Sequence, residues 1–76
     1  MNILPHFNTN YPVLNNHIKR EEFIKKSIRQ KDLDGFIYAL SQGYDIRKKN
    51  SDGEYTLSQA AIHGSISILR YVALEL

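Results

Sequence analysis

The side chains that could perform catalysis or bind a metal are few and widely spaced. The three histidines, His6, His17 and His63, form neither an H-x-x-x-H nor an H-E-x-x-H arrangement, the spacings that bring two ligands to one metal. Asp32 and Asp34 are two residues apart, so on a helix they cannot face each other as a carboxylate pair. The chain has no cysteine, which excludes disulfides, thiolate metal sites and cysteine nucleophiles.

The serines and glycines do not indicate catalysis either. Ser58 and Ser67 lack the G-x-S-x-G context of a nucleophilic serine. The four glycines lie too far apart to form a loop that holds a phosphate. We therefore expect no enzymatic activity, no metal and no cofactor.

Nine of the ten basic residues gather in two clusters, although the formal net charge is only +2. One cluster contains Lys19, Arg20, Lys25, Lys26, Arg29 and Lys31, and the other is Arg47-Lys48-Lys49. Such clusters form either a solvated face or the edge of a binding groove, and the sequence leaves both interpretations open. In the second case they favour an acidic partner.

The length of 76 residues, 42% of them apolar, allows one small domain with a single thin core. No charged segment precedes an apolar stretch near the N-terminus, so no targeting signal is expected. The apolar segment from Ile66 to Leu74 is far shorter than the roughly 20 residues that span a bilayer. We expect a cytoplasmic protein, in its own cell or in a host cell, that contacts no membrane.

Two regions of different composition divide the chain. Residues 1–20 contain both prolines and five of the six asparagines, which favour turns, so an irregular arm is expected there. The arm also carries several apolar residues, and part of it should pack on the domain as a cap. From Glu21 onward the apolar residues recur with helical spacing.

Four helices are expected in residues 21–76. Asp32 is the predicted N-cap of the second helix, and Gly43 is expected near its C-terminal cap. The third helix should end near Gly64, and the fourth should run from about Ile66 to the C-terminus. The core positions of the four helices are Phe23, Ile24, Ser27 and Ile28; Leu33, Phe36, Ile37 and Leu40; Leu57, Ala60 and Ala61; and the apolar residues after Ile66.

A shift of 33 residues superimposes one helix pair on the other. It matches apolar or small residues throughout, and Tyr38 with Tyr71 identically. The other matches are Ile24 with Leu57, Ser27 with Ala60, Ile28 with Ala61, Leu33 with Ile66, Phe36 with Leu69, Ala39 with Val72 and Leu40 with Ala73. A fixed period of this length is typical of repeat proteins.

The segment 52–69, which reads DGEYTLSQAAIHGSISIL, resembles an ankyrin repeat, whose pattern is D-G-x-T-P-L-H-x-A-A-x-x-G-H followed by an apolar helix. The run Gly43-Tyr44-Asp45-Ile46 resembles the family's G-A-D-V turn. The resemblance implies an all-α fold: a short ankyrin-like solenoid of two helix-turn-helix repeats, residues 21–49 and 50–76, behind the irregular N-terminal arm of residues 1–20.

The chain departs from the family pattern at several positions. Tyr55-Thr56 stands in place of Thr-Pro, and Ser58 and Ser65 stand in place of histidines. Lys31 replaces the glycine of the first unit. These departures predict loops that are less rigid than those of consensus repeats.

The resemblance also implies a function, which is protein–protein recognition through the loop tips and the concave faces of the first helices. Matched position by position, the partner-binding residues are Arg29, Gln30, Lys48, Lys49, Ser51, Asp52, Glu54, Ile62 and His63. The expected partner is another protein, through a segment with acidic and apolar groups. The Ile- and Asn-rich composition suggests an AT-rich microbial or viral genome, for which a host-directed protein is expected.

A helix-turn-helix DNA-binding protein is the alternative interpretation. Ala60 and Gly64 have the spacing of that motif, but Ser65 and Arg70 stand where it needs buried residues. The apolar start of the fourth helix also disfavours nucleic-acid recognition.

Self-association is the third interpretation, because two repeats leave an apolar face that a neighbour normally covers. The candidate residues are Leu69, Val72, Leu74 and Leu76. The same apolar end is also explained by a longer array of repeats or by the N-terminal arm folding over it.

Overall fold

The computed structural model describes residues 11–76, and the first ten residues of the predicted arm lie outside the described residues. The described part contains four helices and no strand, which confirms the all-α prediction. The helices are α1 (His17–Gln30), α2 (Leu33–Ser41), α3 (Thr56–Ile62) and α4 (Ile66–Glu75).

Helix α1 begins at His17, whereas its start was predicted at Glu21. Asn16 is its N-cap, and the Asn16 side chain accepts a hydrogen bond from the Lys19 N–H at 2.9 Å. Such a cap satisfies one of the N–H groups that a helix start leaves unpaired. The first turn has a single apolar residue, Ile18, which is 58% exposed, so it shows no apolar period and the prediction missed it. The irregular part of the arm therefore ends at residue 16.

Helix α2 begins as predicted, because the Asp32 carboxylate accepts a hydrogen bond from the Gly35 N–H at 3.0 Å. Its C-cap is Gln42 rather than Gly43, which follows with a φ of 106°. Helix α3 ends at Ile62, shortly before Gly64, and α4 starts at Ile66 as expected.

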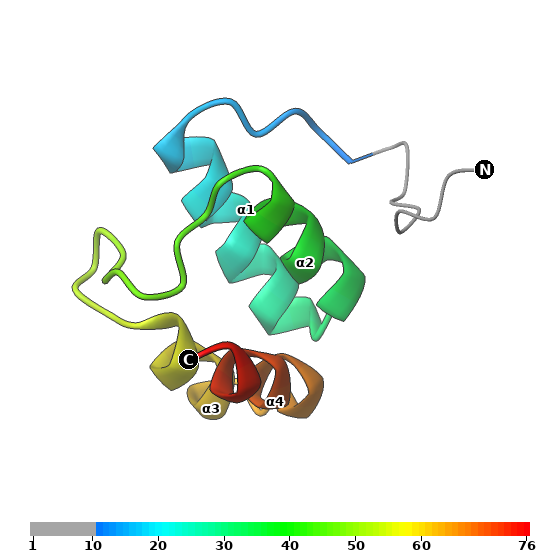
Figure 1. Cartoon of the computed structure of the whole chain (residues 1–76), viewed down its shortest axis with the longest axis vertical. Helices are drawn as coiled ribbons and strands as arrows, with labels where there is room; N and C mark the ends of the chain where they lie inside the picture. Colours follow the sequence, from blue (N-terminus) through cyan, green and yellow to red (C-terminus); the bar gives the residue numbers. More distant parts are fainter. Residues whose placement is uncertain (1–10) are drawn as a thin grey trace.

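The helices form two antiparallel pairs, α1–α2 and α3–α4, which stack on each other through α1–α3 and α2–α4 contacts (Figure 1). The core lies between the two pairs and beneath the arm. Its buried apolar residues are Leu14, Ile24, Ile28, Phe36, Ala39, Ala60, Ile68 and Val72.

Backbone hydrogen bonds repeat with the 33-residue period. The Asp32 N–H donates to the Ser27 carbonyl at 2.8 Å, and the Ser65 N–H donates to the Ala60 carbonyl at 2.9 Å. Both pairs therefore make the same turn between their two helices.

The described part of the arm packs against α1 and α2. The Tyr11 ring lies 5.5 Å from the Phe23 ring and 4.9 Å from the Tyr38 ring, centroid to centroid. The Tyr38 hydroxyl donates to the Pro12 carbonyl at 2.6 Å, and Leu14 is buried. Figure 1 shows the arm beside this helix pair, at the end of the molecule away from α3.

The apolar residues of α4 divide into two groups, which corrects one prediction. Val72 was predicted to take part in self-association, but its side chain is fully buried in the core. Leu69 is partly buried, whereas Leu74 and Leu76 are exposed. Val72 therefore stabilises this chain's own fold.

Within residues 11–76, every helix is too short or too polar to cross a membrane.

Candidate partner-binding groove

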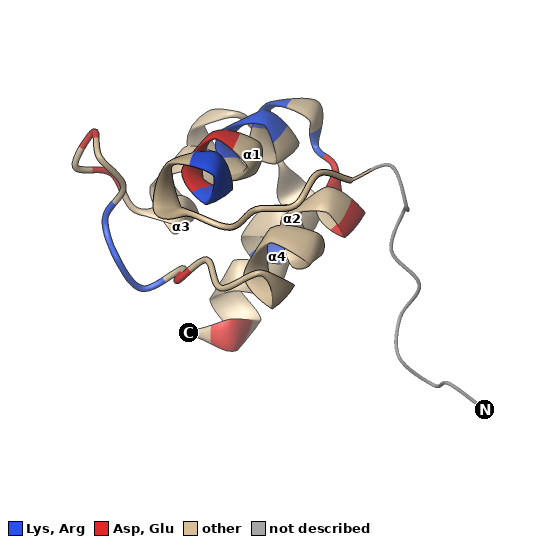
Figure 2. Cartoon of the chain, turned by 90° about the horizontal axis from the view of Figure 1, so that it is seen from above, with Lys and Arg blue, Asp and Glu red and all other residues tan. Residues whose placement is uncertain are grey.

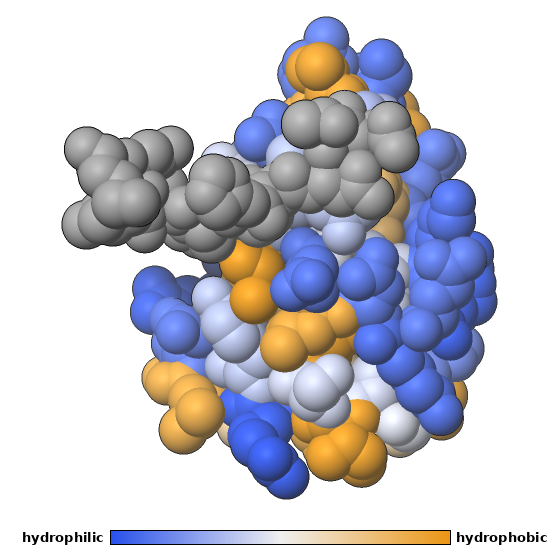
Figure 3. Space-filling view, turned by 90° about the vertical axis from the view of Figure 1, so that its right-hand side faces the viewer, coloured by the Kyte–Doolittle hydropathy of each residue, from blue (hydrophilic) through white to orange (hydrophobic). Residues whose placement is uncertain are grey.

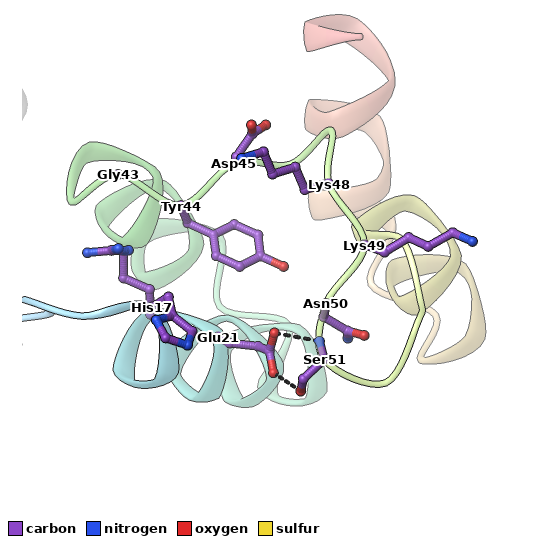
Figure 4. Close-up of a pocket in the computed structure, with 10 residues that line it drawn as sticks. His17, Glu21, Gly43, Tyr44, Asp45, Lys48, Lys49, Asn50 and Ser51 are labelled. Atoms are coloured by element: carbon purple, nitrogen blue, oxygen red, sulfur yellow. Dashed lines mark hydrogen bonds between the residues drawn. The ribbon is translucent and has the colours of Figure 1, made fainter.

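A shallow groove of about 370 Å³ runs between the first half of α1 and the long loop that joins α2 to α3 (Figure 4). It combines charged, polar and aromatic side chains on a surface open to solvent. The lining residues are His17, Arg20, Glu21, Gly43, Tyr44, Asp45, Lys48, Lys49, Asn50 and Ser51.

The tip of the loop is folded around Asn50. The Asn50 side-chain oxygen accepts hydrogen bonds from the N–H groups of Asp52, at 2.9 Å, and Glu54, at 3.0 Å. The backbone N–H of Asn50 donates to the Glu54 carbonyl at 2.8 Å. Gly53 has a φ of 77°, which a residue with a side chain adopts only at a cost. The tip is thus a closed turn with a defined shape.

Two contacts attach this tip to α1. The Glu21 carboxylate accepts hydrogen bonds from the Ser51 N–H, at 2.8 Å, and from the Ser51 hydroxyl (Figure 4). The Lys25 ammonium lies 2.7 Å from Asp52 Oδ2 and 3.7 Å from Glu21. Exposed ion pairs stabilise a fold by about 1 kcal/mol or less, so these contacts mainly determine where the tip lies.

The titration of both α1 residues reflects these contacts. The hydrogen bond from the Ser51 hydroxyl lowers the pKa of Glu21, and the hydrogen bond to Asp52 raises the pKa of Lys25. Each shift favours the charged form of the group. At neutral pH the negative charge of Glu21 is therefore already compensated within the chain.

Tyr44 contributes an aromatic surface to the groove. Its side chain is partly buried, and the Thr56 hydroxyl donates to its oxygen at 3.4 Å. Burial raises the pKa of Tyr44, so the phenol stays neutral at physiological pH.

The loop side of the groove is basic. Lys48 and Lys49 are exposed, and the Lys49 ammonium lies 5.5 Å from the centre of the Tyr55 ring. Figure 2 shows this basic stretch followed by acidic residues at the loop tip. On the α1 side, Arg20 donates to the Leu14 carbonyl at 3.2 Å.

The predicted partner-binding residues fall into two sets. Lys48, Lys49 and Ser51 line the groove, and Asp52 and Glu54 adjoin it in the tip. The second set is exposed at the C-terminal ends of α1 and α3 and does not line this groove: Arg29, Gln30, Ile62 and His63.

The sequence interpretation missed two groove residues on α1, His17 and Glu21, whereas Arg20 belongs to the basic cluster that was considered as a groove edge. His17 and Glu21 lie four residues apart, so on one helix they share a face. Asn16 as an N-cap was the signal that could have extended the helix to include His17. Tyr44 was noted only as part of the family-like turn.

The groove is open and polar, and its lining residues are mostly charged or hydrogen-bonding. Among residues 11–76, no cluster of three or more His, Asp or Glu side chains could hold a metal ion. The side chains present offer cations, hydrogen-bonding groups and an aromatic surface.

The α3–α4 pair meets only part of the helix-turn-helix pattern. Ser65 is fully buried, so this position satisfies the motif despite its polar side chain. Arg70 is exposed, although the motif needs a buried residue there.

Comparison of the chain with family models, curated proteins and solved structures finds no match.

Proposed function

We propose that this chain is a non-catalytic protein-interaction module that binds an acidic segment of another protein along the groove between α1 and the α2–α3 loop. The resemblance to ankyrin repeats supports this function, since that family recognises proteins through the equivalent loops and first helices. The 33-residue recurrence of backbone hydrogen bonds is consistent with a repeat architecture.

The main support is the attachment of the loop tip to α1. Glu21 and Lys25 hold Ser51 and Asp52, while Lys48 and Lys49 stay exposed at the same groove. A binding loop held in place before the partner arrives loses less conformational entropy on association. The exposed ammonium groups attract an acidic partner and raise its association rate.

The setting proposed for this interaction is the cytoplasm of the producing cell or of a host cell. A host-directed microbial or viral protein fits the Ile- and Asn-rich composition. The set at the helix ends, Arg29, Gln30, Ile62 and His63, would extend the contact along the same side of the repeats, as in the ankyrin pattern.

Selection from a random peptide library on the immobilised full chain tests the proposal. We expect enrichment of peptides with several Asp or Glu residues beside an apolar residue. Against one such peptide, Lys48→Glu should lower the association rate by about tenfold at low salt and change dissociation little. Selected peptides without an acidic bias would contradict the proposal.

Arg70→Glu is the matched control, because it makes the same charge change at an exposed residue outside the groove. It should leave peptide binding unchanged.

Binding to a duplex DNA of about 20 base pairs tests the alternative function, which is DNA recognition by a helix-turn-helix. Tight, salt-dependent DNA binding that Arg70→Glu abolishes would favour the helix-turn-helix interpretation over the groove.

A further inference from the structure

The second helix pair exposes an apolar face, here called the open face, formed by Leu57, Ala61, Ile66, Leu69 and Ala73. Leu57 is 37% exposed and Ile66 is 61% exposed. Ala61 and Ala73 are also exposed, and Leu69 is partly buried. Figure 3 shows apolar surface at the lower end of the molecule, where α3 and α4 lie.

The same face of the first helix pair is covered. The 33-residue equivalents of Leu57, Ala61 and Leu69 are Ile24, Ile28 and Phe36, and all three are at most 2% exposed.

The second pair provides this cover. The Tyr71 ring of α4 lies 6.1 Å from the Phe36 ring, edge to face. The Ser65 hydroxyl donates to the Ile28 carbonyl. The open face therefore continues, one repeat further, an interface that the structure already contains.

The residues of the open face suit a symmetric contact with an identical face. In α3 a large residue, Leu57, precedes a small one, Ala61, by four positions, and in α4 Leu69 precedes Ala73 in the same way. When two copies of one helix pack antiparallel about a two-fold axis, the large residue of each meets the small residue of the other.

A head-to-tail contact between copies is blocked. The surface of the first pair that would receive another open face includes Phe23 and Tyr38. Tyr11 stacks on both rings, and the Pro12 carbonyl accepts the Tyr38 hydroxyl. The arm therefore occupies this surface.

We infer that the occupant of the open face is a second copy of this chain, bound in a two-fold symmetric dimer through α3 and α4. The inference goes beyond the proposed function, because the groove lies on α1 and the α2–α3 loop. The dimer would present two grooves, so a partner with two acidic segments could bind both at once with raised avidity.

Sedimentation equilibrium of the full chain across a concentration series tests the dimer. We expect the mass to rise from that of one chain, 8.8 kDa, toward twice that value. Ala73→Glu places a charge on both sides of the contact and should weaken dimerisation by at least about tenfold. An equimolar mixture of Ala73→Glu and Ala73→Lys should restore a dimer, which separates an effect on the interface from a loss of folding.

Leu74→Glu is the control. Leu74 is 82% exposed, yet its equivalent in the first pair, Ser41, stays exposed beside the stacked repeat. This variant should dimerise like the wild type. A folded monomer at every concentration, or equal loss of dimer from Leu74→Glu and Ala73→Glu, would overturn the inference and assign the open face to another occupant, such as a different repeat protein.

Discussion

Lys31 and Gly64, 33 residues apart, adopt the same left-handed backbone conformation, with φ values of 57° and 67°. Each follows the first helix of its pair, and its N–H donates to a carbonyl three residues earlier, at 3.1 Å for Lys31 and 3.2 Å for Gly64. Glycine adopts this conformation readily, whereas a lysine is strained in it. The first pair thus makes the same turn as the second, although a lysine stands where the second pair has a glycine.

The strain at Lys31 predicts that Lys31→Gly stabilises the fold. Relief of the left-handed conformation should raise the free energy of unfolding by about 0.5–1 kcal/mol, measured by urea denaturation. Lys26→Gly, the same substitution in the interior of α1, should instead lower it by about 1 kcal/mol. Gly64→Ala should also lower it by about 1 kcal/mol, from backbone strain alone, because a Cβ at Gly64 would meet no atom within 4 Å. Destabilisation by Lys31→Gly would contradict this account of the turn.

The hydrogen bonds from Ser51 to Glu21 predict a pH dependence of the loop tip. The folded-state pKa of Glu21 lies below its ordinary value of 4.5. The contact therefore stabilises the fold above pH 4.5, and this stabilisation is lost as the pH falls through the folded-state pKa. An NMR titration of the Glu21 carboxyl carbon measures this pKa, and Ser51→Ala should raise it.

Ser41→Ala is the control for that titration, since the Ser41 hydroxyl bonds the Tyr38 carbonyl instead. Glu21 should titrate in this variant as it does in the wild type. A pKa of Glu21 unchanged by Ser51→Ala would show that the serine does not hold the carboxylate in solution.

The helix pairs could be predicted from the sequence because apolar spacing and capping are local signals. Asp32 caps α2 through the N–H of Gly35, three residues away, and the 33-residue period aligns the two pairs. The start of α1 was predicted too late because its first turn has only one apolar residue, the exposed Ile18, and only the capping of Asn16 marks it.

The candidate site was only partly predictable, because its α1 side depends on which helix the loop tip reaches. The attachment of Ser51 to Glu21 joins residues 30 positions apart, and no local pattern specifies such a contact. The self-association role predicted for Val72 was wrong for the same reason. Val72 and Leu74 are both apolar, and only the stacking of the second pair on the first decides that Val72 is buried.

The buried hydroxyl of Ser65 predicts a contribution to the contact between the pairs. Ser65 precedes α4 but makes no side-chain capping bond, so its hydroxyl acts through the Ile28 carbonyl of α1. Ser65→Ala should lower the free energy of unfolding by about 1 kcal/mol, measured by thermal or urea denaturation. Ser67→Ala, at an exposed position two residues along, should change it by less than about 0.5 kcal/mol. Equal effects of the two substitutions would argue against the inter-pair hydrogen bond.

The packing of the arm predicts that residues 11–14 are an integral part of the domain. Leu14 is 3% exposed, whereas its neighbour Val13 is 69% exposed. Leu14→Ala leaves a cavity in the core and should lower the free energy of unfolding by about 2–4 kcal/mol. Val13→Ala should change it by less than about 0.5 kcal/mol, because that side chain is already in water. Both variants keep the same chain length and charge, so the difference between their urea denaturation midpoints reports the burial of Leu14. Equal midpoints would mean that the arm does not cap the first helix pair in solution.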